Sequence, residues 1–477
     1  MSRVPRLLCP GLAALVVASM PALLAFGTTG HAASPATWGK ALRIPGLSTL
    51  AAKQTEPSVT ALSCPAPGWC TAGGFYATNS EPSYPNDQGF LADEIRGVWG
   101  RAFEIPGIGK LNVDHSGRIV EDISCASAGN CAVVGDYSSA TTGEQGFLVS
   151  ELHGRWGLAE AIPGLAALTA GGGTAAVQSV SCPATGDCVA VGAYRTAGGL
   201  SGVVRAYVVE QANGVWSTAQ TIPGVTGSDL ASVSCPAPGA CVAGGAYVKN
   251  GAQLGFVVEQ SHGSWSGAQA IPGLSGLGKA GVDRVSCSSI GNCSAAGGFT
   301  GTAGPNDRQE FVATETRSHW GSARPIPGLT RLNLGEDAVV SSLSCGLGGR
   351  CILGGTYLRN RGGDHFAAFV ALSIDGAWRP AQRIPGLDAI DPGHNSNVES
   401  VSCEPSGDCA AVGGFSGKGA GSAFLVNEVA GKWGRAEAVP GLSLDELFQS
   451  EAVSCASQGC TAVGDGMYGF DVVAPHL

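Results

Sequence analysis

Eight copies of one pattern of hydrophobic and polar positions run along the chain, each centred on a Ser-Cys pair. Before each pair, apolar residues alternate with small or polar ones, as in the segment that ends Val180-Ser181-Cys182. Such alternation puts the apolar residues on one face and therefore predicts a β-strand. Three further apolar segments follow in each copy, with turn residues between them. The pattern predicts four short strands per copy, which we name A, B, C and D in chain order.

Strands A and B are expected to form a hairpin whose turn lies between two cysteines. Five residues separate the cysteines in seven copies, and the fourth of them is glycine, for example Gly186. A tight hairpin needs a left-handed residue, and glycine adopts that conformation without steric cost. We predict disulfides rather than zinc sites, because zinc needs two closer pairs per ion and no histidine recurs. The predicted disulfides are Cys64–Cys70, Cys125–Cys131, Cys182–Cys188, Cys235–Cys241, Cys287–Cys293, Cys345–Cys351, Cys403–Cys409 and Cys455–Cys460.

Other recurring residues predict how the strands pack. A glycine four residues after each second cysteine, for example Gly245, indicates that something bulky crosses strand B, and we expect the tryptophan of strand D, such as Trp265. Strand C carries an aromatic residue followed by apolar ones, as at Phe256, so both its faces should be covered. An Ile-Pro-Gly or Val-Pro-Gly sequence ends strand D, because proline cannot donate to the ladder. The eight serines have no histidine partners, so we expect each to make a local hydrogen bond rather than to catalyse.

The two ends of the chain carry complementary parts of the repeat. A lone strand D at Trp38 precedes the first complete copy, and strands A, B and C end the last copy near Phe470. In a closed ring the N-terminal strand completes the last blade and hides both edges. We therefore predict an all-β fold: residues 34–477 form a single eight-bladed β-propeller of four-stranded antiparallel blades, with one disulfide hairpin per blade, and the N-terminal strand 36–44 closes the ring. A seven-bladed ring with one divergent unit and a pair of smaller sheets are the alternatives.

Residues 1–33 have the layout of a secretory signal peptide: basic Arg3 and Arg6, an apolar run, and small residues before Ala33. A retained membrane anchor is the alternative. We expect the segment to be removed, which leaves a secreted, extracellular chain without a membrane span. Its removal also discards Cys9, the one unpaired cysteine among 17. The formal net charge of −10, with charged residues at only 13% of the chain, argues against nucleic acid as a partner.

The repeat resembles that of known propeller families. Gly244-Gly245-Ala246-Tyr247, followed by Gly263-Ser264-Trp265 and Ile271-Pro272-Gly273, is similar to the kelch repeat, in which a Gly-Gly pair closes a strand and a spaced Tyr and Trp follow. The Ser-Cys and Cys-Val-Ala-Val-Gly elements resemble the cysteine-containing repeats of secreted actinobacterial proteins. The segment from Ser373 to Trp378 is similar to an Asp-box of sialidase-like propellers. Folds of this kind host enzymes and binding modules alike, so the resemblance implies a fold rather than a function.

Candidate ligand residues lie on the loops that join strand B to strand C and strand D to the next strand A. These loops share one side of the predicted ring and vary in length, and binding residues concentrate on such loops. Neighbouring Asp and His can ligate a metal or transfer protons, although a solvated loop is the simpler interpretation. We interpret Glu151, Glu259 and Glu428, near the turns from C to D, as solvated rim charge. The candidate ligand residues are Asp87, Asp114, His115, Asp307, Asp364, His365, Asp391 and His394.

We expect a non-enzymatic binding or interaction protein that acts as a monomer on an extracellular glycan, cell-wall component or protein. The alternative is a carbohydrate-active enzyme, a glycosidase or lyase, which would need two carboxylates converging at the mouth of the ring. A copper oxidase is a weaker third hypothesis, because the eight histidines are few and scattered. No nucleophile elbow, zinc-protease motif or phosphate loop is present in the sequence. We therefore predict no catalytic residue, no cofactor and no metal.

Overall fold

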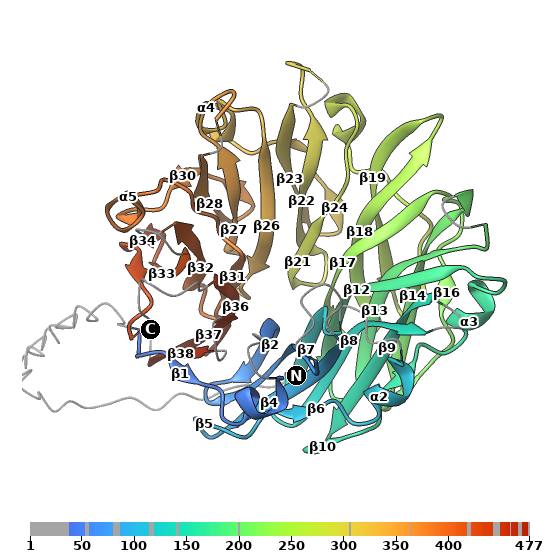
Figure 1. The fold of residues 1–477 in the computed structure, drawn as a ribbon. Helices are drawn as coiled ribbons and strands as arrows, with labels where there is room; N and C mark the ends of the chain where they lie inside the picture. Colours follow the sequence, from blue (N-terminus) through green and yellow to red (C-terminus); the bar gives the residue numbers. More distant parts are fainter. Residues whose placement is uncertain are drawn as a thin grey trace, which may run out of the picture. The chain divides into compact units, whose positions relative to one another are not determined.

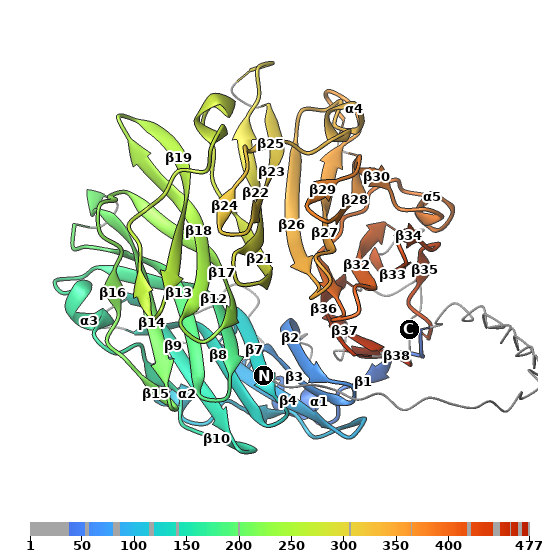
Figure 2. The ribbon, with the colours of Figure 1, turned by 180° about the vertical axis from the view of Figure 1, so that it is seen from behind.

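Eight antiparallel sheets account for nearly all the regular structure that the computed structural model describes. The strands of each sheet pair in the order A, B, C, D, as predicted, and Figures 1 and 2 show the sheets following one another in chain order by colour. Each A strand contacts the A strands of the two neighbouring sheets. This is a β-propeller with four-stranded antiparallel blades. The described residues are 38–52, 57–79, 86–113, 119–139, 143–198, 201–304, 307–363, 365–416, 421–441, 449–457, 459–465 and 470–475.

We number the sheets 1 to 8 in chain order of their A strands. Sheets 1 and 2 consist of β2 (Ser58–Ala66), β3 (Trp69–Ala77), β4 (Asp87–Ile95), β5 (Val98–Trp99) and β6 (Phe103–Glu104), and of β7 (Asp122–Ser127), β8 (Asn130–Ser139), β9 (Gly143–Leu152), β10 (Arg155–Trp156) and β11 (Glu160–Ala161). Sheets 3 and 4 consist of β12 (Thr174–Ala184), β13 (Asp187–Arg195), β14 (Val204–Ala212), β15 (Val215–Trp216) and β16 (Gln220–Thr221), and of β17 (Ser228–Ala237), β18 (Ala240–Lys249), β19 (Ala252–Ser261) and β20 (Ser264–Trp265).

The remaining four sheets repeat the same order. Sheets 5 and 6 consist of β21 (Arg284–Ser289), β22 (Asn292–Thr300), β23 (Arg308–Thr316), β24 (His319–Trp320) and β25 (Arg324–Pro325), and of β26 (Ala338–Cys345), β27 (Cys351–Leu358), β28 (Phe366–Ile374), β29 (Ala377–Trp378) and β30 (Gln382–Arg383). Sheets 7 and 8 consist of β31 (Ser400–Cys403), β32 (Cys409–Ser416), β33 (Gly421–Val429), β34 (Lys432–Trp433) and β35 (Glu437–Ala438), and of β36 (Gln449–Ala456), β37 (Gly459–Asp465), β38 (Phe470–Pro475) and β1 (Leu42–Arg43).

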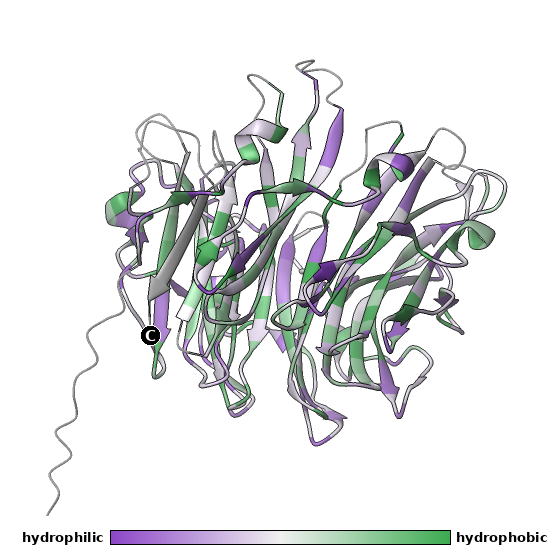
Figure 3. Ribbon diagram, turned by 90° about the horizontal axis from the view of Figure 1, so that it is seen from below, coloured by the Kyte–Doolittle hydropathy of each residue, from purple (hydrophilic) through white to green (hydrophobic). Residues whose placement is uncertain are grey.

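The hydrophobic cores lie between neighbouring sheets rather than within one central mass. The strand C aromatics of sheets 1 to 7, Phe256 among them, have no exposed surface, in agreement with the prediction that both faces of strand C are covered. Figure 3 shows hydrophobic residues along much of the length of the strands. The junction of sheets 7 and 8 contains Trp38 and Val453, and the junction of sheets 8 and 1 contains Ile44 and Val59 in the same kind of cluster.

The serine of each Ser-Cys pair joins two sheets. Its Oγ accepts a hydrogen bond from the backbone N–H of the equivalent cysteine in the next sheet, at 2.9–3.0 Å. We predicted a local bond, whereas the observed bond runs between sheets. The donor and acceptor pairs are Cys125 to Ser63, Cys182 to Ser124, Cys235 to Ser181, Cys287 to Ser234, Cys345 to Ser286, Cys403 to Ser344, Cys455 to Ser402 and Cys64 to Ser454.

The recurring glycine of strand B lies under backbone, not under tryptophan. A Cβ at Gly245 would lie 1.9 Å from the carbonyl oxygen of Asp229 on strand A of the same sheet, and six other sheets give 1.8–2.1 Å at the equivalent glycine. The prediction that tryptophan crosses this glycine was therefore wrong. Strand A bulges by one residue near this point, between Leu230 and Ser232 in sheet 4, and the bulge accompanies the close approach of the strand A carbonyl.

Strand D is divided into two short pieces in most sheets. In sheet 3, β15 and β16 both pair with β14, and the residues between them turn toward the preceding sheet. There the N–H of Ala219 donates to the carbonyl of Pro163 at 2.8 Å. The recurring alanine and the recurring Ile-Pro-Gly are thus partners across a sheet junction, and equivalent bonds of 2.7–2.8 Å occur at seven junctions.

The N-terminal strand is shorter than predicted. Instead of residues 36–44, only β1 at Leu42–Arg43 is a strand, and it pairs antiparallel with β38, which Figure 1 shows beside it. The reason is the same division, because the N–H of Ala41 donates to Pro440 of sheet 7 rather than to the ladder of sheet 8. Residues 36 and 37, like the predicted signal peptide at residues 1–33, lie outside the described residues.

Short helices follow the proline-glycine sequences. In each, the glycine has a left-handed φ of 76–84° and the next residue, for example Leu165, is a buried leucine or isoleucine. None of the helices in the described residues is long and apolar enough to cross a membrane. The helices are α1 (Leu47–Leu50), α2 (Ile108–Leu111), α3 (Leu165–Leu168), the 3₁₀ helix η2 (Leu274–Leu277), α4 (Leu329–Leu332) and α5 (Leu387–Ile390).

Candidate functional site

Each sheet has two chemically different ends. The turns from A to B and from C to D lie at one end, which we call the disulfide side, because every A–B turn is closed by a disulfide. All eight disulfides have the predicted partners, with Cα atoms 3.9–4.1 Å apart. The B–C loops and D–A connections lie at the other end, which we call the loop side.

The structure places the candidate ligand residues at separate junctions on the loop side. Asp114, His115 and Asp364 lie outside the described residues. Asp87 begins β4, where its backbone carbonyl accepts a hydrogen bond from Asn112 Nδ2 at 2.8 Å and burial raises the pKa of its carboxyl.

Asp307 is 5% exposed and holds its own loop. Its Oδ2 accepts the N–H of Ala303 at 2.9 Å, and its Oδ1 accepts Gln309 Nε2 at 2.6 Å. Its carboxylate is therefore engaged within the chain, although the residue lies at the edge of the cleft described below.

His365, Asp391 and His394 lie near α5. The Oδ1 of Asp391 accepts the N–H of Asn395 at 3.3 Å, and the side chain has no exposed surface, so Asp391 shapes the connection after α5. His394 is exposed with a left-handed φ of 51°. Within the described residues, no group of three or more His, Cys, Asp and Glu is arranged to hold a metal ion.

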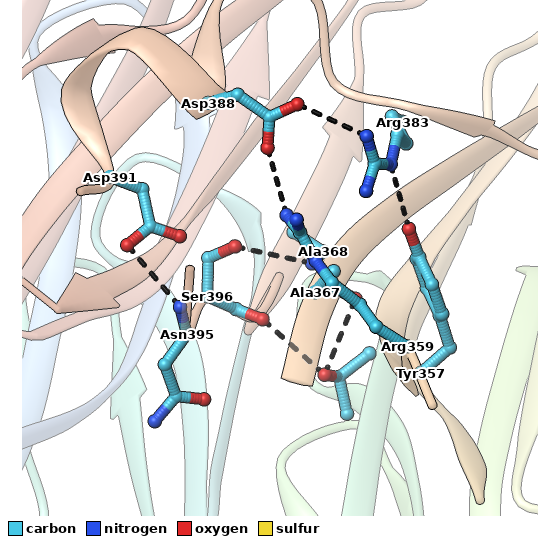
Figure 4. A network of polar contacts seen from close by, with 10 residues as sticks. Tyr357, Arg359, Ala367, Ala368, Arg383, Asp388, Asp391, Asn395 and Ser396 are labelled. Atoms are coloured by element: carbon cyan, nitrogen blue, oxygen red, sulfur yellow. Dashed lines mark hydrogen bonds and ion pairs between the residues drawn. The ribbon is translucent and has the colours of Figure 1, made fainter. Parts of the chain in front are cut away.

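A charged network next to α5 fixes this part of the loop side. Figure 4 shows Asp388 between two arginines: Arg359 Nη2 lies 2.8 Å from Asp388 Oδ1, and Arg383 Nη1 lies 3.2 Å from Asp388 Oδ2. Arg383 Nε also donates to the hydroxyl of Tyr357 at 3.0 Å. The hydrogen bond from Arg359 and the nearby arginine charges hold the pKa of Asp388 below its usual value. Asp388 is thus paired with both arginines, and Arg383 also with Tyr357, which indicates a structural role.

A polar cleft of about 420 Å³ opens on the loop side between sheets 4, 5 and 6. Two exposed side chains, Gln253 from β19 and Lys279 from the connection before β21, stand on one flank, and Arg308 and Asp337 stand on the other. Asp283 lies between them, where its Oδ2 accepts the N–H of Gly298 at 3.1 Å. Carboxylate, amide, ammonium and guanidinium groups thus converge on one hollow, which suits a polar ligand rich in hydrogen-bonding groups.

Two charged residues next to this cleft were missed in the sequence. Glu310, on β23, has a fully buried side chain whose Oε1 lies 3.5 Å from Arg308 Nε, and burial, aided by Asp283, raises its pKa to about 8. Arg284, on β21, donates from Nε to the carbonyl of Ser341 at 2.6 Å and from Nη1 to the carbonyl of Asp283 at 2.9 Å. These arginines oppose the rise that burial causes in the pKa of Asp283.

A position-by-position comparison of the copies would have found both residues. The residue before the strand C aromatic is glycine or alanine in seven copies and glutamate only at Glu310. The residue three before the first cysteine is serine or alanine in six copies, and the exceptions are Asp122 and Arg284. Glu310 pairs across the ladder with Gly298, whose missing side chain leaves room for the carboxylate: a Cβ at Gly298 would lie 3.3 Å from Glu310 Oε1. Sheet 5 therefore departs from the repeat at two charged positions beside one cleft.

The glutamates near the C–D turns are not solvated rim charge. Glu151 is 7% exposed and Glu428 has no exposed surface. Glu259 accepts the indole N–H of Trp320, from the next sheet, at 2.8 Å. Trp156, Trp216, Trp265 and Trp378 donate in the same way to Asp93, Ser150, Glu210 and Thr314 of the preceding sheets. The recurring tryptophan therefore joins sheets, and the glutamates beside it are enclosed at the junctions.

We predict that stability falls as pH rises through the neutral range. Burial, followed by repulsion from Asp93 and Glu259 respectively, raises the pKa of Glu151 and of Glu315 to about 7. Because the folded chain holds these protons more tightly than the unfolded chain, their stabilisation is complete below pH 4.5 and is lost as pH rises to about 7. The melting temperature should therefore drop by about 5 °C between pH 5 and pH 8.

The double variant Glu151→Gln, Glu315→Gln should lose at least half of this drop. Glutamine already occupies the equivalent positions as Gln211 and Gln260, so both replacements fit the fold. Circular dichroism melts of the parent and the variant at both pH values measure the difference. An unchanged pH dependence in the variant would show that other groups are responsible.

Comparisons with known proteins give no family and only distant structural likeness. No protein-family model and no curated protein matches the chain. Among solved structures, Sqt1 from Chaetomium thermophilum, bound to the N-terminus of the ribosomal protein L10, is 12% identical with a TM-score of 0.45, over 88% of this chain and 97% of that chain. The β-propeller domain of the trilobed protease from Pyrococcus furiosus is 8% identical with a TM-score of 0.40, over 74% and 92%. The α-L-arabinanase from Penicillium chrysogenum is 9% identical with a TM-score of 0.39, over 75% and 93%.

Likeness at these TM-scores carries no argument about function. The resemblance to kelch repeats and to the secreted actinobacterial repeats stays a prediction from the residues of the repeat, because no family model supports it.

Proposed function

We propose that this protein is a secreted, monomeric, non-enzymatic binding propeller that recognises an extracellular glycan in the loop-side cleft between sheets 4, 5 and 6. The observation that carries the proposal is the departure of sheet 5 from the repeat. Glu310 replaces the glycine or alanine of the other seven copies, and Arg284 replaces the serine or alanine of six copies. Arg284 contacts Asp283, and Glu310 contacts Arg308, both of which line the cleft. The Glu310 carboxylate lies 3.5 Å from the Arg308 guanidinium, and Arg284 donates to the backbone carbonyl of Asp283. The two replacements therefore hold residues that line the cleft, which fits a role in binding better than a role in the scaffold.

The groups in the cleft suit sugar hydroxyls. The carboxylates of Asp283 and Asp337 accept hydrogen bonds, Lys279 and Arg308 donate them, and the amide of Gln253 does both. The aromatic side chain of Phe299 adds an apolar patch to the same lining. Mixed donors and acceptors around a shallow hollow match a ligand whose hydroxyl groups each do both.

We propose further that the eight sheets close into one ring with the N-terminal strand as its last element. Three observations support closure: β1 pairs with β38, Cys64 N–H donates to Ser454 Oγ at 2.9 Å, and Ala102 N–H donates to the carbonyl of Pro45 at 2.7 Å. The first is the pairing of strand D with strand C that the other sheets also have. The other two are the serine–cysteine and alanine–proline hydrogen bonds that join other neighbouring sheets, and here they join sheets 8 and 1. Closure would hold the loop-side connections of all sheets in a fixed frame.

Secretion is supported by the disulfides and by the signal-like N-terminal sequence. Eight disulfide hairpins in the described residues form and persist in an oxidising compartment. The basic, apolar and small-residue segments of residues 1–33 supply the corresponding export signal.

A glycosidase or lyase is the alternative, and Asp283 with Glu310 is the carboxylate pair it would use. Glycoside hydrolysis needs both carboxyl groups at the scissile bond. The Glu310 side chain has no exposed surface and lies behind Gly298, so it does not reach a ligand in the cleft. This burial favours binding over hydrolysis.

A glycan panel tests the proposal. We expect the secreted protein to bind at least one immobilised glycan, and Lys279→Gln and Asp283→Asn to weaken that binding by about tenfold each. Asp283→Asn keeps the shape of the side chain, and Lys279 is exposed, so neither replacement should disturb the fold. Arg317→Gln, an exposed residue at the disulfide side, is the matched control and should bind like the parent.

If all three variants bind as tightly as the parent, the cleft is not the binding site. If the protein binds no glycan of the panel, the ligand is not a glycan of the kinds tested and the proposal fails. Release of reducing sugar from a bound glycan would replace the binding proposal with the enzyme alternative.

A further inference from the structure

A second pocket, of about 340 Å³, lies on the disulfide side between sheets 4 and 5. Pro236 and Pro238 of the A–B turn in sheet 4 and Ile290 of the A–B turn in sheet 5 give it apolar walls. Gln260 on β19 and Glu315 on β23 contribute its polar surface. These two residues are only 5% and 3% exposed, respectively. The pocket is at the opposite end of the sheets from the proposed glycan cleft.

Two acceptor atoms in this pocket have no hydrogen-bond partner among the described residues. They are Oε1 of Gln260 and Oε2 of Glu315. A buried acceptor without a donor costs about 1–3 kcal/mol, more when it is charged. Both atoms belong to side chains that line the same pocket, so a ligand that donates hydrogen bonds would satisfy them together.

The charge of the pocket is negative. Glu259 also lines it, and Glu259 lies close enough to Glu315 to help raise the pKa of the latter. Of the described residues that line the pocket, His262 is the one that can carry a positive charge, and it is exposed at the rim. A cation that enters therefore meets two carboxylates and an amide oxygen with no lysine or arginine to compete.

The same arrangement recurs between sheets 1 and 2. There Asp93 and Glu94 on β4 face Glu151 on β9 in a smaller pocket of about 120 Å³, and Oε2 of Glu94 has no partner. Asp93, Glu94 and Glu151 occupy the positions of Glu259, Gln260 and Glu315 in the repeat. An acceptor-rich, donor-poor junction is thus a feature of the fold at two places, and only the pocket between sheets 4 and 5 has room for an organic molecule.

We propose that the pocket between sheets 4 and 5 binds a small organic primary ammonium ion. The ammonium group has three N–H donors. Two would donate to Gln260 Oε1 and Glu315 Oε2, and the third would donate to the carboxylate of Glu259. The alkyl body would pack against Pro236, Pro238 and Ile290. The ligand class follows from the pocket, whose lining combines acceptors and negative charge with apolar side chains.

Three probes with one alkyl chain test the head group. Pentylammonium, pentanol and pentanoate are titrated into the intact secreted protein, with binding followed by saturation-transfer NMR. We expect pentylammonium to bind at least about tenfold more tightly than pentanol, and pentanoate not to bind, because only the first brings both charge and donors. Equal binding of pentylammonium and pentanol would overturn the proposal.

Two substitutions that the chain already carries at equivalent positions locate the site. Glu315→Gln should weaken pentylammonium binding by at least about tenfold, and Gln260→Glu should strengthen it severalfold, since a charged acceptor binds a cation more strongly than a neutral one. Gln211 and Glu94 show that glutamine and glutamate fit at this position of strand C. The charge-matched control is Glu160→Gln on β11, which is exposed and outside the pocket. Unchanged affinity in both pocket variants, with unchanged melting temperatures, would refute the site.

Discussion

Deleting residues 38–47 is expected to lower the melting temperature by more than about 10 °C. The segment supplies three buried side chains, Trp38, Ile44 and Leu47, and the strand that pairs with β38. Trp38 packs in the junction of sheets 7 and 8, and Ile44 and Leu47 pack in that of sheets 8 and 1. Its loss would therefore open two junctions at once and expose the edge of β38.

The comparison is made with the same chain starting at residue 34, by differential scanning calorimetry. Leu42→Ala, at a residue that is 60% exposed on the same strand, is the internal control and should change the melting temperature by less than about 2 °C. A deletion that melts like the parent would mean that the N-terminal segment does not complete sheet 8.

Gly245→Ala is expected to cost about 3 kcal/mol or more in unfolding free energy. The new Cβ would lie 1.9 Å from the carbonyl oxygen of Asp229 and 3.0 Å from Cα of Leu230, which are backbone atoms that cannot rotate away. Strand A of sheet 4 would have to move, and the move would disturb the bond from Val285 N–H to Ser232 Oγ in the next sheet.

Gly276→Ala provides the matched control. This glycine, in η2, has no atom within 4 Å of the place that a Cβ would occupy and no left-handed φ, so alanine should be neutral or slightly stabilising there. Chemical denaturation of both variants gives the two free energies. A Gly245→Ala protein as stable as the control would show that strand A yields easily, and would leave the recurrence of this glycine unexplained.

The scaffold was predictable because equivalent residues have the same structural role in each sheet. Eight Ser-Cys hairpins predicted the strand order and every disulfide partner, and the complementary ends predicted that residues near Trp38 belong with the last sheet. The reason for each recurrence was predicted less well. Serine, tryptophan, alanine and proline turn out to be bonding partners between sheets, and such partners are about one repeat apart in the sequence, where no local pattern shows them.

That the loop side is the ligand-binding face stays a prediction from the sequence. The loop side does carry a polar cleft, but Asp307 and Asp391 accept hydrogen bonds from backbone N–H groups of their own loops, as short acidic side chains commonly do. The residues that converge on the cleft come from three sheets. A single amino-acid sequence does not show which residues of different sheets lie close together. The departures at Arg284 and Glu310 were visible in the sequence, since Glu310 breaks a rule that the other seven copies keep and Arg284 breaks one that six copies keep.

Glycan binding in the loop-side cleft is tested most directly by a crystal structure of the protein with the glycan fragment that binds best in the panel. The account predicts sugar density in the loop-side cleft, with hydroxyl groups within 3.5 Å of Asp283 and of Lys279 or Arg308, which is about the outer limit of a hydrogen bond. Density for the sugar on the disulfide side, or at a junction that does not include sheet 5, would contradict it.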